Sequence, residues 1–230
     1  MRDEILTHTE MCARERTMLQ RGMYFRQPPA VSVALMSRRP GAPYVDSLSE
    51  DGSELAYEGH DAIRTSAIDP KQADQPSQLP SGSLTENGMF ARAANEYKKS
   101  ASSPALVRVY EKLRPGIWSD RGLFELVDYE YEPVGGRRVF RFKMRLTSEA
   151  GEPSVKVGVR SDAALSRVIP SSIKQEVYKR DKGQCVLCGA KDHLHFDHDY
   201  PHSKGGTSLI AENVRLLCAR HNLEKAAKIQ

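Results

Sequence analysis

The fold of the C-terminal part of the chain is decided by one stretch, from Cys185 to Lys225, which reads CVLCGAKDHLHFDHDYPHSKGGTSLIAENVRLLCARHNLEK. It contains two short-spaced pairs of metal-ligand residues, Cys185-x-x-Cys188 and Cys218-x-x-His221. Together the pairs supply the four ligands of a tetrahedral structural zinc ion. A CxxC motif is also typical of a redox pair, but that interpretation leaves Cys218 and His221 without a role. The spacing therefore favours zinc.

The same stretch carries a second set of polar residues: Asp197, His198, Asn213 and Asn222. Residues 193–200 are typical of a strand, 201–207 of a wide loop, 214–217 of a returning strand and 219–228 of a helix. In that order, we expect the zinc pairs to tie the first turn to the helix. We also expect Asp197, His198 and Asn222 to face one cleft.

Residues 168–230 resemble the HNH nuclease family, which has the ββα-metal fold. The resemblance rests on DHDYPHSKGG and NVRLLCARHNLEK. Asn222 stands where the last histidine of the family name would be, and His221 replaces the usual fourth zinc cysteine. The resemblance implies an endonuclease with a structural zinc and a catalytic Mg, Mn or similar divalent ion. It also implies that Asn213 orients the loop and the catalytic base.

The chemistry of phosphodiester hydrolysis requires these residue types. The substrate is an anion with a poor leaving group, so a divalent ion must polarise the phosphate. Such an ion prefers oxygen ligands, which Asp197 and the Asn222 amide supply. An imidazole suits proton removal from water near neutral pH, so we predict His198 as the general base. An Asp-His pair alone is more often a solvated or hydrogen-bonded feature of a strand. We assign no role to His193, His195 and His202, which we expect at the surface or behind the site.

Composition indicates a globular protein without a membrane segment. The chain has 230 residues, enough for two domains, with 39% hydrophobic and 28% charged residues. No apolar run is long enough to span a bilayer, and residues 1–22 lack the apolar core of a signal peptide. We therefore expect a cytoplasmic protein with reduced cysteines, in which Cys12 is a buried thiol without function.

The net charge of +4 is ordinary, but the charges are unevenly distributed. Residues 41–69 hold seven acidic residues and one basic residue, whereas residues 88–147 hold twelve basic and seven acidic ones. This pattern suits contact of the second region with a phosphate backbone. Arg141, Lys143 and Arg145, which alternate with apolar residues in a predicted strand, and Lys204 are our candidates for that contact. Solvation of a half-exposed sheet is the alternative explanation for the alternation.

The N-terminal part alternates strand-like and helix-like segments. We expect a helix within residues 1–22, strands over 31–36, 106–113, 123–131, 138–146 and 155–159, and a long surface loop over 67–82. Phe90, Ala93, Ala94 and Tyr97 form the stripe of an amphipathic helix that begins after Thr85. Ser172 and Gln175 form a capping-box signature for a helix over 173–182. Several strands around one helix predict a barrel-like domain.

Residues 30–147 resemble an SRA domain, a PUA-like fold. The resemblance rests on YEGHD, LTENGMFARAA and the segment from VRVYEKL to FRFKMRL. It implies that the domain flips a modified base, such as 5-methyl- or 5-hydroxymethylcytosine, into a pocket. Tyr44 and Tyr57 would then sandwich the base, with Asp46 accepting a hydrogen bond and Glu58 in the pocket wall. DRGLFEL and Glu58-Gly59-His60 depart from the family pattern, which suggests a different base. Alternatively, Tyr44 and Asp46 are ordinary loop residues.

These features predict an α+β protein: residues 1–28 of unknown role, an SRA-like modified-base reader over 29–160, a linker over 161–170 and an HNH domain over 171–230. The chain thus resembles SRA-HNH, McrA-like type IV restriction endonucleases, which cut DNA that carries modified bases. One such site cuts one strand, so we expect a homodimer on double-stranded DNA. Two alternatives stay open. They are an HNH nuclease without modification dependence and a non-enzymatic, zinc-stabilised reader of modified DNA.

Overall fold

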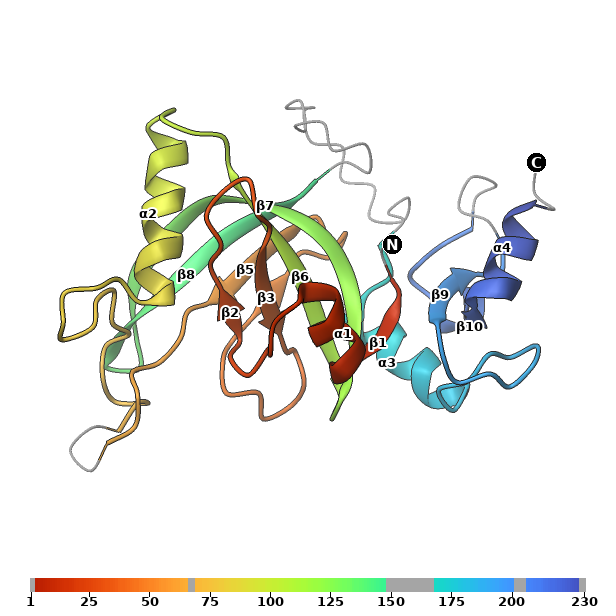
Figure 1. Cartoon of the computed structure of the whole chain (residues 1–230). Helices are drawn as coiled ribbons and strands as arrows, with labels where there is room; N and C mark the ends of the chain where they lie inside the picture. The colour runs from red at the N-terminus through yellow and green to blue at the C-terminus, as the bar shows by residue number, and fades with distance from the viewer. Residues whose placement is uncertain (1–2, 66–68, 148–167, 201–205, 228–230) are drawn as a thin grey trace.

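The computed structural model describes residues 3–65, 69–147, 168–200 and 206–227, and within them the chain has an α+β fold (Figure 1). A large mixed sheet has the strand order β2-β3-β6-β7-β8-β5-β4, and β1 pairs separately with β7. Its strands are β1 Ile5–Thr7, β2 Met23–Tyr24, β3 Ser32–Met36, β4 Ser47–Leu48, β5 Glu54–Glu58, β6 Ala105–Arg114, β7 Ile117–Val134 and β8 Arg137–Leu146. We call residues 3–147 the large-sheet unit.

The sheet is antiparallel except where β3 runs parallel to β6. Its main core lies between the sheet and helix α2, Glu86–Lys98. Thr85 begins α2 by accepting a hydrogen bond from the Gly88 N–H. Phe90 of α2 packs against Phe142 of β8, with ring centroids 5.5 Å apart. The predictions of α2, β3, β6 and β8 are confirmed, and the apolar side chains of β8 face this core as its alternation predicts.

Three sequence predictions differ from the structure in extent. The expected helix in residues 1–22 is only α1, His8–Glu15, because Thr7 forms a capping box with Glu10 and the left-handed Arg16 ends the helix. Strand β7 begins at Ile117, before the predicted 123–131 segment, because β1 and β6 supply backbone partners there. The long loop is confirmed for residues 69–82, which contain neither helix nor strand.

The helix predicted over 173–182 is α3, Ser171–Arg180, and its capping-box prediction is wrong. The helix begins after Pro170 without a side-chain cap. The Ser171 hydroxyl instead accepts a hydrogen bond from Arg121 of β7, at 2.8 Å. The predicted strand over 155–159 lies outside the described residues.

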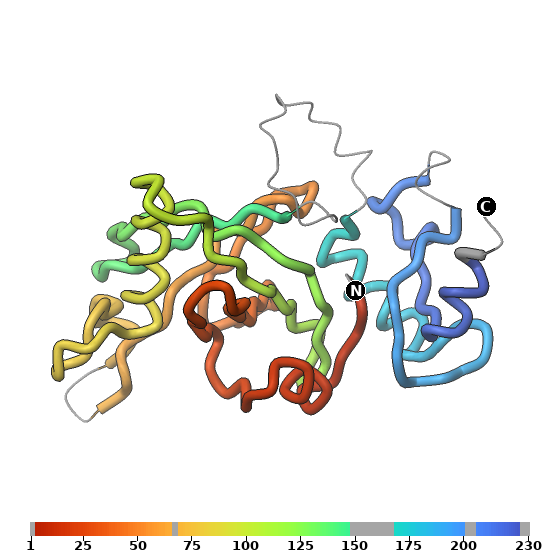
Figure 2. Tube along the Cα trace, turned by 45° about the horizontal axis from the view of Figure 1, so that its top comes forward, coloured from red at the N-terminus to blue at the C-terminus, as the bar shows by residue number. Residues whose placement is uncertain are grey.

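The C-terminal elements form a small ββα arrangement, as predicted. Strand β9, Leu194–His198, pairs antiparallel with β10, Val214–Cys218, and α4, Ala219–Ala227, follows. A short 3-10 helix, Ala211–Asn213, precedes β10. We call residues 168–227 the ββα unit. Figure 2 shows the N-terminal strand between this unit and the large sheet. Within the described residues, none of the helices has the length and apolar character that crossing a membrane requires.

Candidate functional site

Four metal-ligand side chains converge in the ββα unit: Cys185, Cys188, Cys218 and His221. Their ligand atoms all lie within 4.8 Å of one another. The His221 Nδ1 atom is 3.4 Å from the sulfur of Cys185 and 3.4 Å from that of Cys218, while the Cys188 and Cys218 sulfurs are 3.9 Å apart. A turn supplies the first two cysteines, the end of β10 supplies the third and the first turn of α4 supplies the histidine.

These distances fit a zinc ion. Zn–S bonds of about 2.3 Å and Zn–N bonds of about 2.0 Å in a tetrahedron place two sulfurs about 3.8 Å apart, and sulfur and nitrogen about 3.5 Å apart. The cysteines are free of disulfides. Burial would raise the pKa of Cys185, but backbone N–H groups of Cys218, Leu187 and Cys188 lower it to about 6. The thiolate that a zinc ion requires is therefore accessible at neutral pH.

Asp197 and His198 lie at the end of β9, where the strand leaves the small sheet. Helix α4 packs along the same strand through Lys225, whose ammonium contacts the Asp197 carboxylate and the His198 carbonyl oxygen. Asn222 lies three residues before Lys225, so both are on the same face of α4. The structure thus brings Asp197 to the α4 face that bears Asn222, whereas the contact of α4 with His198 is to its backbone carbonyl and the His198 imidazole faces Ser208.

Two polar residues in this region were not predicted. Lys225 neutralises Asp197. The sequence signal for Lys225 is its position three residues after Asn222, which places both residues on the same face of the helix. Ser208 is fully buried, and its hydroxyl lies 2.8 Å from the Nε2 atom of His198. This contact fixes the orientation of the imidazole. Ser208 follows the glycine-rich loop without any distinctive spacing, so the sequence offered no signal for it.

Asn213 holds the chain that follows β9. Its side-chain oxygen accepts the Tyr200 N–H at 2.8 Å, and its side-chain nitrogen donates to the Thr207 carbonyl at 2.8 Å. The Asp199 N–H donates to the Asn213 carbonyl at 2.7 Å. One asparagine thus fixes both described ends of the connection between β9 and the 3-10 helix.

The other histidines have different environments. His193 is exposed, with a φ of 48°, whereas His195 is buried and 6% exposed. The Nδ1 atom of His195 has no hydrogen-bond partner among the described residues. Burial lowers the pKa of His195, so its imidazole is neutral near pH 7. His202 lies outside the described residues.

A second candidate site is a cavity of about 700 Å³ in the large-sheet unit, lined in part by Tyr44 and Asp46. Trp118, Arg21, Arg39 and Lys112 also line it. An aromatic ring, a carboxylate and several cations therefore surround one hollow. This composition suits a flat polar ring that is attached to an anionic backbone.

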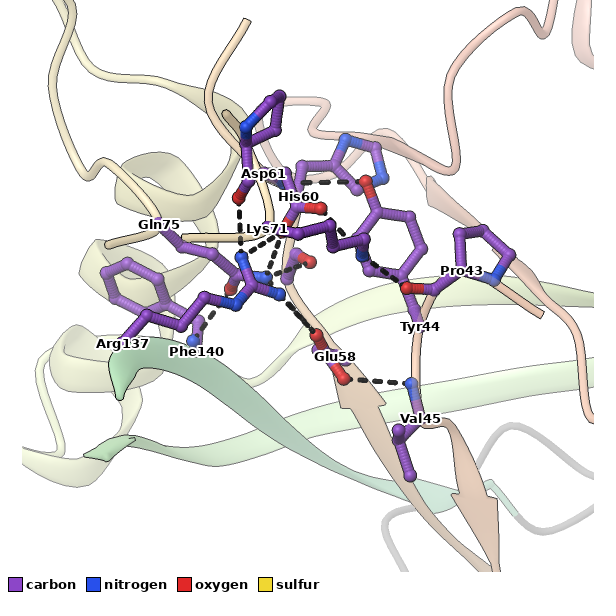
Figure 3. Close-up of polar contacts among 12 residues, drawn as sticks. Pro43, Tyr44, Val45, Glu58, His60, Asp61, Lys71, Gln75, Arg137 and Phe140 are labelled. Carbon is purple, nitrogen blue, oxygen red and sulfur yellow. Dashed lines mark hydrogen bonds and ion pairs between the residues drawn. The ribbon is translucent and has the colours of Figure 1, made fainter. Parts of the chain in front are cut away.

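Asp46, which lines the cavity, is held by backbone donors, whereas Glu58, predicted in the pocket wall, does not line the cavity and is held with Asp61 by a buried arginine. Asp46 accepts the N–H groups of Ser37 and Glu58, at 3.0 and 3.1 Å, and burial raises its pKa to about 6. Figure 3 shows Arg137 pointing at Glu58 and Asp61, with nitrogen–oxygen distances of 3.3 and 2.6 Å. We call Glu58, Asp61, Gln75 and Arg137 the buried polar cluster.

The two tyrosines predicted to sandwich a base are not equivalent. Tyr44 stacks on His60, with ring centroids 5.7 Å apart, and the Lys71 ammonium lies 4.4 Å from the centre of its ring. Burial lowers the pKa of His60 to about 4, so a neutral imidazole supports the tyrosine. Tyr57 is 1% exposed in the main core, and its hydroxyl donates to the Gly22 carbonyl at 2.8 Å. Tyr57 therefore does not line the cavity.

The basic residues of β8 are partly neutralised by carboxylates. Arg141 pairs with Glu132 of β7 at 3.2 Å, and Lys143 contacts Glu130. Arg145 makes no ion pair within the described part of the chain. Lys204 lies outside the described residues. A contact of β8 with a phosphate backbone would thus compete with existing ion pairs, and it stays a prediction.

The sequence matches no protein-family model, and the search of curated proteins found no relative. Among solved structures, an SRA domain of SUVH5 with hemimethylated CG DNA is 20% identical, with a TM-score of 0.44 over 66% of this chain and 90% of that one. KRYPTONITE with mCHH DNA is 14% identical, with a TM-score of 0.42 over 69% and 34% of the two chains. The type IV phosphorothioation-dependent restriction endonuclease ScoMcrA is 16% identical, with a TM-score of 0.42 over 98% and 56%. These TM-scores lie below 0.5, so the likeness assigns neither a family nor a function.

Proposed function

We propose that this protein is a metal-dependent DNA endonuclease that acts on duplexes carrying a modified base. The observation that carries the proposal is the contact of Lys225, one turn after Asn222 on α4, with the Asp197 carboxylate and the His198 carbonyl at the end of β9. Next to these residues, four ligand atoms have the spacing of a structural zinc site. A zinc-braced ββα unit that carries a carboxylate, an imidazole and an amide near this contact suits phosphodiester hydrolysis.

In the proposed reaction, Asp197 and the Asn222 amide oxygen would hold a divalent ion of the Mg or Mn type. Such an ion would polarise the phosphate and stabilise the departing oxygen. His198 takes the proton of the attacking water, and the Ser208 contact holds the imidazole in orientation. Asn213 acts by fixing the chain beside His198, and it needs no contact with the substrate.

The cavity in the large-sheet unit is the proposed site for the modified base. Tyr44 would stack on the flipped base, and Asp46 would face its polar edge. Tyr57 and Glu58 are buried and do not line the cavity, so they have no direct contact with the base in this proposal. The cations that line the cavity, together with Arg141, Lys143, Arg145 and Lys204, are the proposed contacts with the DNA backbone.

A single site of this kind cuts one strand, so a double-strand break requires two copies of the chain. We therefore propose a homodimer on modified double-stranded DNA. We place the protein in the cytoplasm, where cysteine ligands stay reduced.

The test is cleavage of duplexes that are identical in sequence and carry cytosine, 5-methylcytosine, 5-hydroxymethylcytosine or 5-hydroxymethyluracil, with Mg or Mn. Cutting confined to modified duplexes supports both sites. Equal cutting of every duplex would leave the nuclease and remove the modified-base reader. No cutting with any metal would favour the non-enzymatic reader.

Replacement of His198 tests the assignment of the general base. We expect His198→Ala to lower the cleavage rate by about 10²- to 10⁴-fold, because a positioned base contributes about that much. Zinc content and DNA binding should not change. His193→Ala is the matched control, since His193 is exposed on the same unit. Full cleavage by His198→Ala with ample metal would refute the assignment.

A further inference from the structure

The two units are joined through backbone hydrogen bonds of the N-terminal strand. On one side, the Asp3 N–H donates to the Asp120 carbonyl of β7 at 2.7 Å, and the Asp120 N–H donates to the Glu4 carbonyl at 2.9 Å. On the other side, the Phe196 N–H of β9 donates to the Asp3 carbonyl at 3.2 Å. The strand therefore bonds to both the large sheet and the small one, and Figure 2 shows its trace lying between them.

Buried charges cross the same boundary. Lys174 of α3 is fully buried, and its ammonium contacts the Asp3 carboxylate and, at 2.9 Å, the Ser119 hydroxyl of β7. Arg121 of β7 is 2% exposed. It donates to Glu111 of β6 at 2.7 Å and to the Ile169 carbonyl of the ββα unit at 2.7 Å. Two buried cations, one from each unit, thus make hydrogen bonds across the boundary.

Apolar packing is continuous across the boundary as well. Ile5 and Leu113 belong to the same buried cluster as Ile169, Val177 and Phe196 of the ββα unit. The loop residue Gly52 lies so close to Val168 that an added Cβ atom would be 2.2 Å from a Val168 methyl carbon. We call the contacts of Asp3, Ile5, Leu113, Arg121 and Lys174 the join.

The join has the character of a core and differs from a contact between loosely tethered domains. Interfaces between mobile domains are small and more polar than a core. Separation of the two units here would break strand pairing and expose Ile5 and Leu113. It would also leave Lys174 and Arg121 without their carbonyl, hydroxyl and carboxylate partners. The two units therefore move as one body.

We propose that Lys174 and Arg121 are specificity-determining residues that set where the DNA is cut, because the join fixes the distance from the base cavity to Asp197 and His198. This inference rests on the proposed function. It predicts that the phosphodiester cut lies at one constant offset from the modified base. The offset would not depend on the length of chain between Thr147 and Val168.

The experiment maps cut positions on a duplex with a single modified base. The first variant carries a Gly-Ser insertion of about ten residues between positions 155 and 156, which lengthens the connection without touching the join. We expect the wild-type protein and this variant to share one cut position. A shifted or broadened pattern for the insertion would show that the tether sets the distance, and would overturn the proposal.

The second variant, Lys174→Met, keeps the length of the side chain and removes its charge. We expect its cuts to spread over several neighbouring phosphodiesters, with at least a twofold loss at the wild-type position. Lys98→Met is the matched control, because Lys98 pairs with Asp128 at 2.7 Å on the exposed side of α2, away from the join. If Lys174→Met does not fold, Asp3→Asn weakens the same contact from the other partner. A folded variant of either kind that keeps a single cut position overturns the proposal.

Small-angle X-ray scattering of the same proteins without DNA distinguishes a failure of the join from a failure of the proposed function. We expect wild-type protein and Lys98→Met to scatter as one compact particle, and Lys174→Met to have a larger radius of gyration. If no duplex is cut, the proposed function fails and the constant offset fails with it. An unchanged radius for folded Lys174→Met would instead overturn the join alone.

Discussion

The zinc-type cluster and the buried polar cluster are held in shape by different forces. In the ββα unit, Cys185, Cys188, Cys218 and His221 are spaced for an ion that must itself supply the binding energy. In the large-sheet unit, the buried polar cluster needs no ion, because Arg137 already neutralises Glu58 and Asp61. The cluster is therefore complete from protein atoms alone, whereas we expect the ββα unit to depend on a metal ion for its shape.

Metal removal should produce the largest difference in stability between the two units. Structural zinc contributes about 10–16 kcal/mol of apparent free energy in small zinc domains, so chelation or Cys218→Ala should unfold much of the ββα unit. Amide hydrogen exchange should then become fast in β9 and α4 and stay slow in α2. Cys12→Ala is the control, since Cys12 lies outside the cluster. Equal loss of protection in both units would contradict the comparison.

Loss of Arg137 should instead destabilise the large-sheet unit and leave the zinc-type cluster intact. Arg137→Met removes the buried cation that Glu58 and Asp61 share and leaves them, among the described cations, only the more exposed Lys71 and the longer 3.8 Å contact with Arg141, so we expect a loss of about 3–5 kcal/mol in the free energy of unfolding. Denaturant titration measures this loss, and zinc content should stay unchanged. The neighbouring Arg138 is exposed, so Arg138→Met is a matched control with a small effect. A small effect of Arg137→Met would show that other contacts hold the buried polar cluster.

The cavity should also respond to pH through Asp46. Burial raises the pKa of Asp46 from 3.8 to about 6, so its protonated form favours the folded state. The resulting stability is fully present below pH 3.8 and is lost as pH rises through 6. The difference in unfolding free energy between wild type and Asp46→Asn should therefore change by about 3 kcal/mol over this range. A constant difference between pH 4 and pH 7 would refute the burial of this carboxylate.

The smallest expected effect concerns Lys225. Its ammonium neutralises Asp197, which is the proposed ligand of the catalytic ion. Lys225→Met should strengthen Mn²⁺ binding about fivefold, because a partly exposed ion pair is worth up to about 1 kcal/mol. Electron paramagnetic resonance of Mn²⁺ measures the affinity without any cleavage assay. Lys191→Met, on an exposed loop of the same unit, should leave it unchanged.

The sequence predicted those features that depend on residues close to one another in the chain. Within each ligand pair, the two residues lie three positions apart in the sequence. The two pairs converge once β9 and β10 pair. The alternation in β8 and the stripe of α2 likewise correspond to faces that the structure buries. These features depend on residues within a few positions of one another, so their periods are visible in the sequence alone.

Long-range packing determined what could not be predicted. Tyr57 was placed in the cavity by resemblance, yet it shares the core-facing side of β5 with Leu55, which a period of two already indicates. Asp3, Arg121 and Lys174 meet only through the tertiary fold, and nothing in their local sequence marks them as partners. The role of residues 1–28 was also hidden, because β1 and β2 acquire their partners from β7 and β3.

The position of β1 has a consequence for how the protein folds during its synthesis. Residues 3–5 leave the ribosome before β7 and β9, yet they bond to both. The N-terminal strand must therefore wait until β9 has emerged before it can pair with both neighbours. A nascent chain would carry the paired strands β3, β6, β7 and β8 while the ββα unit still lacked a fixed place beside them. Docking of the ββα unit onto this earlier-made strand would then complete the join.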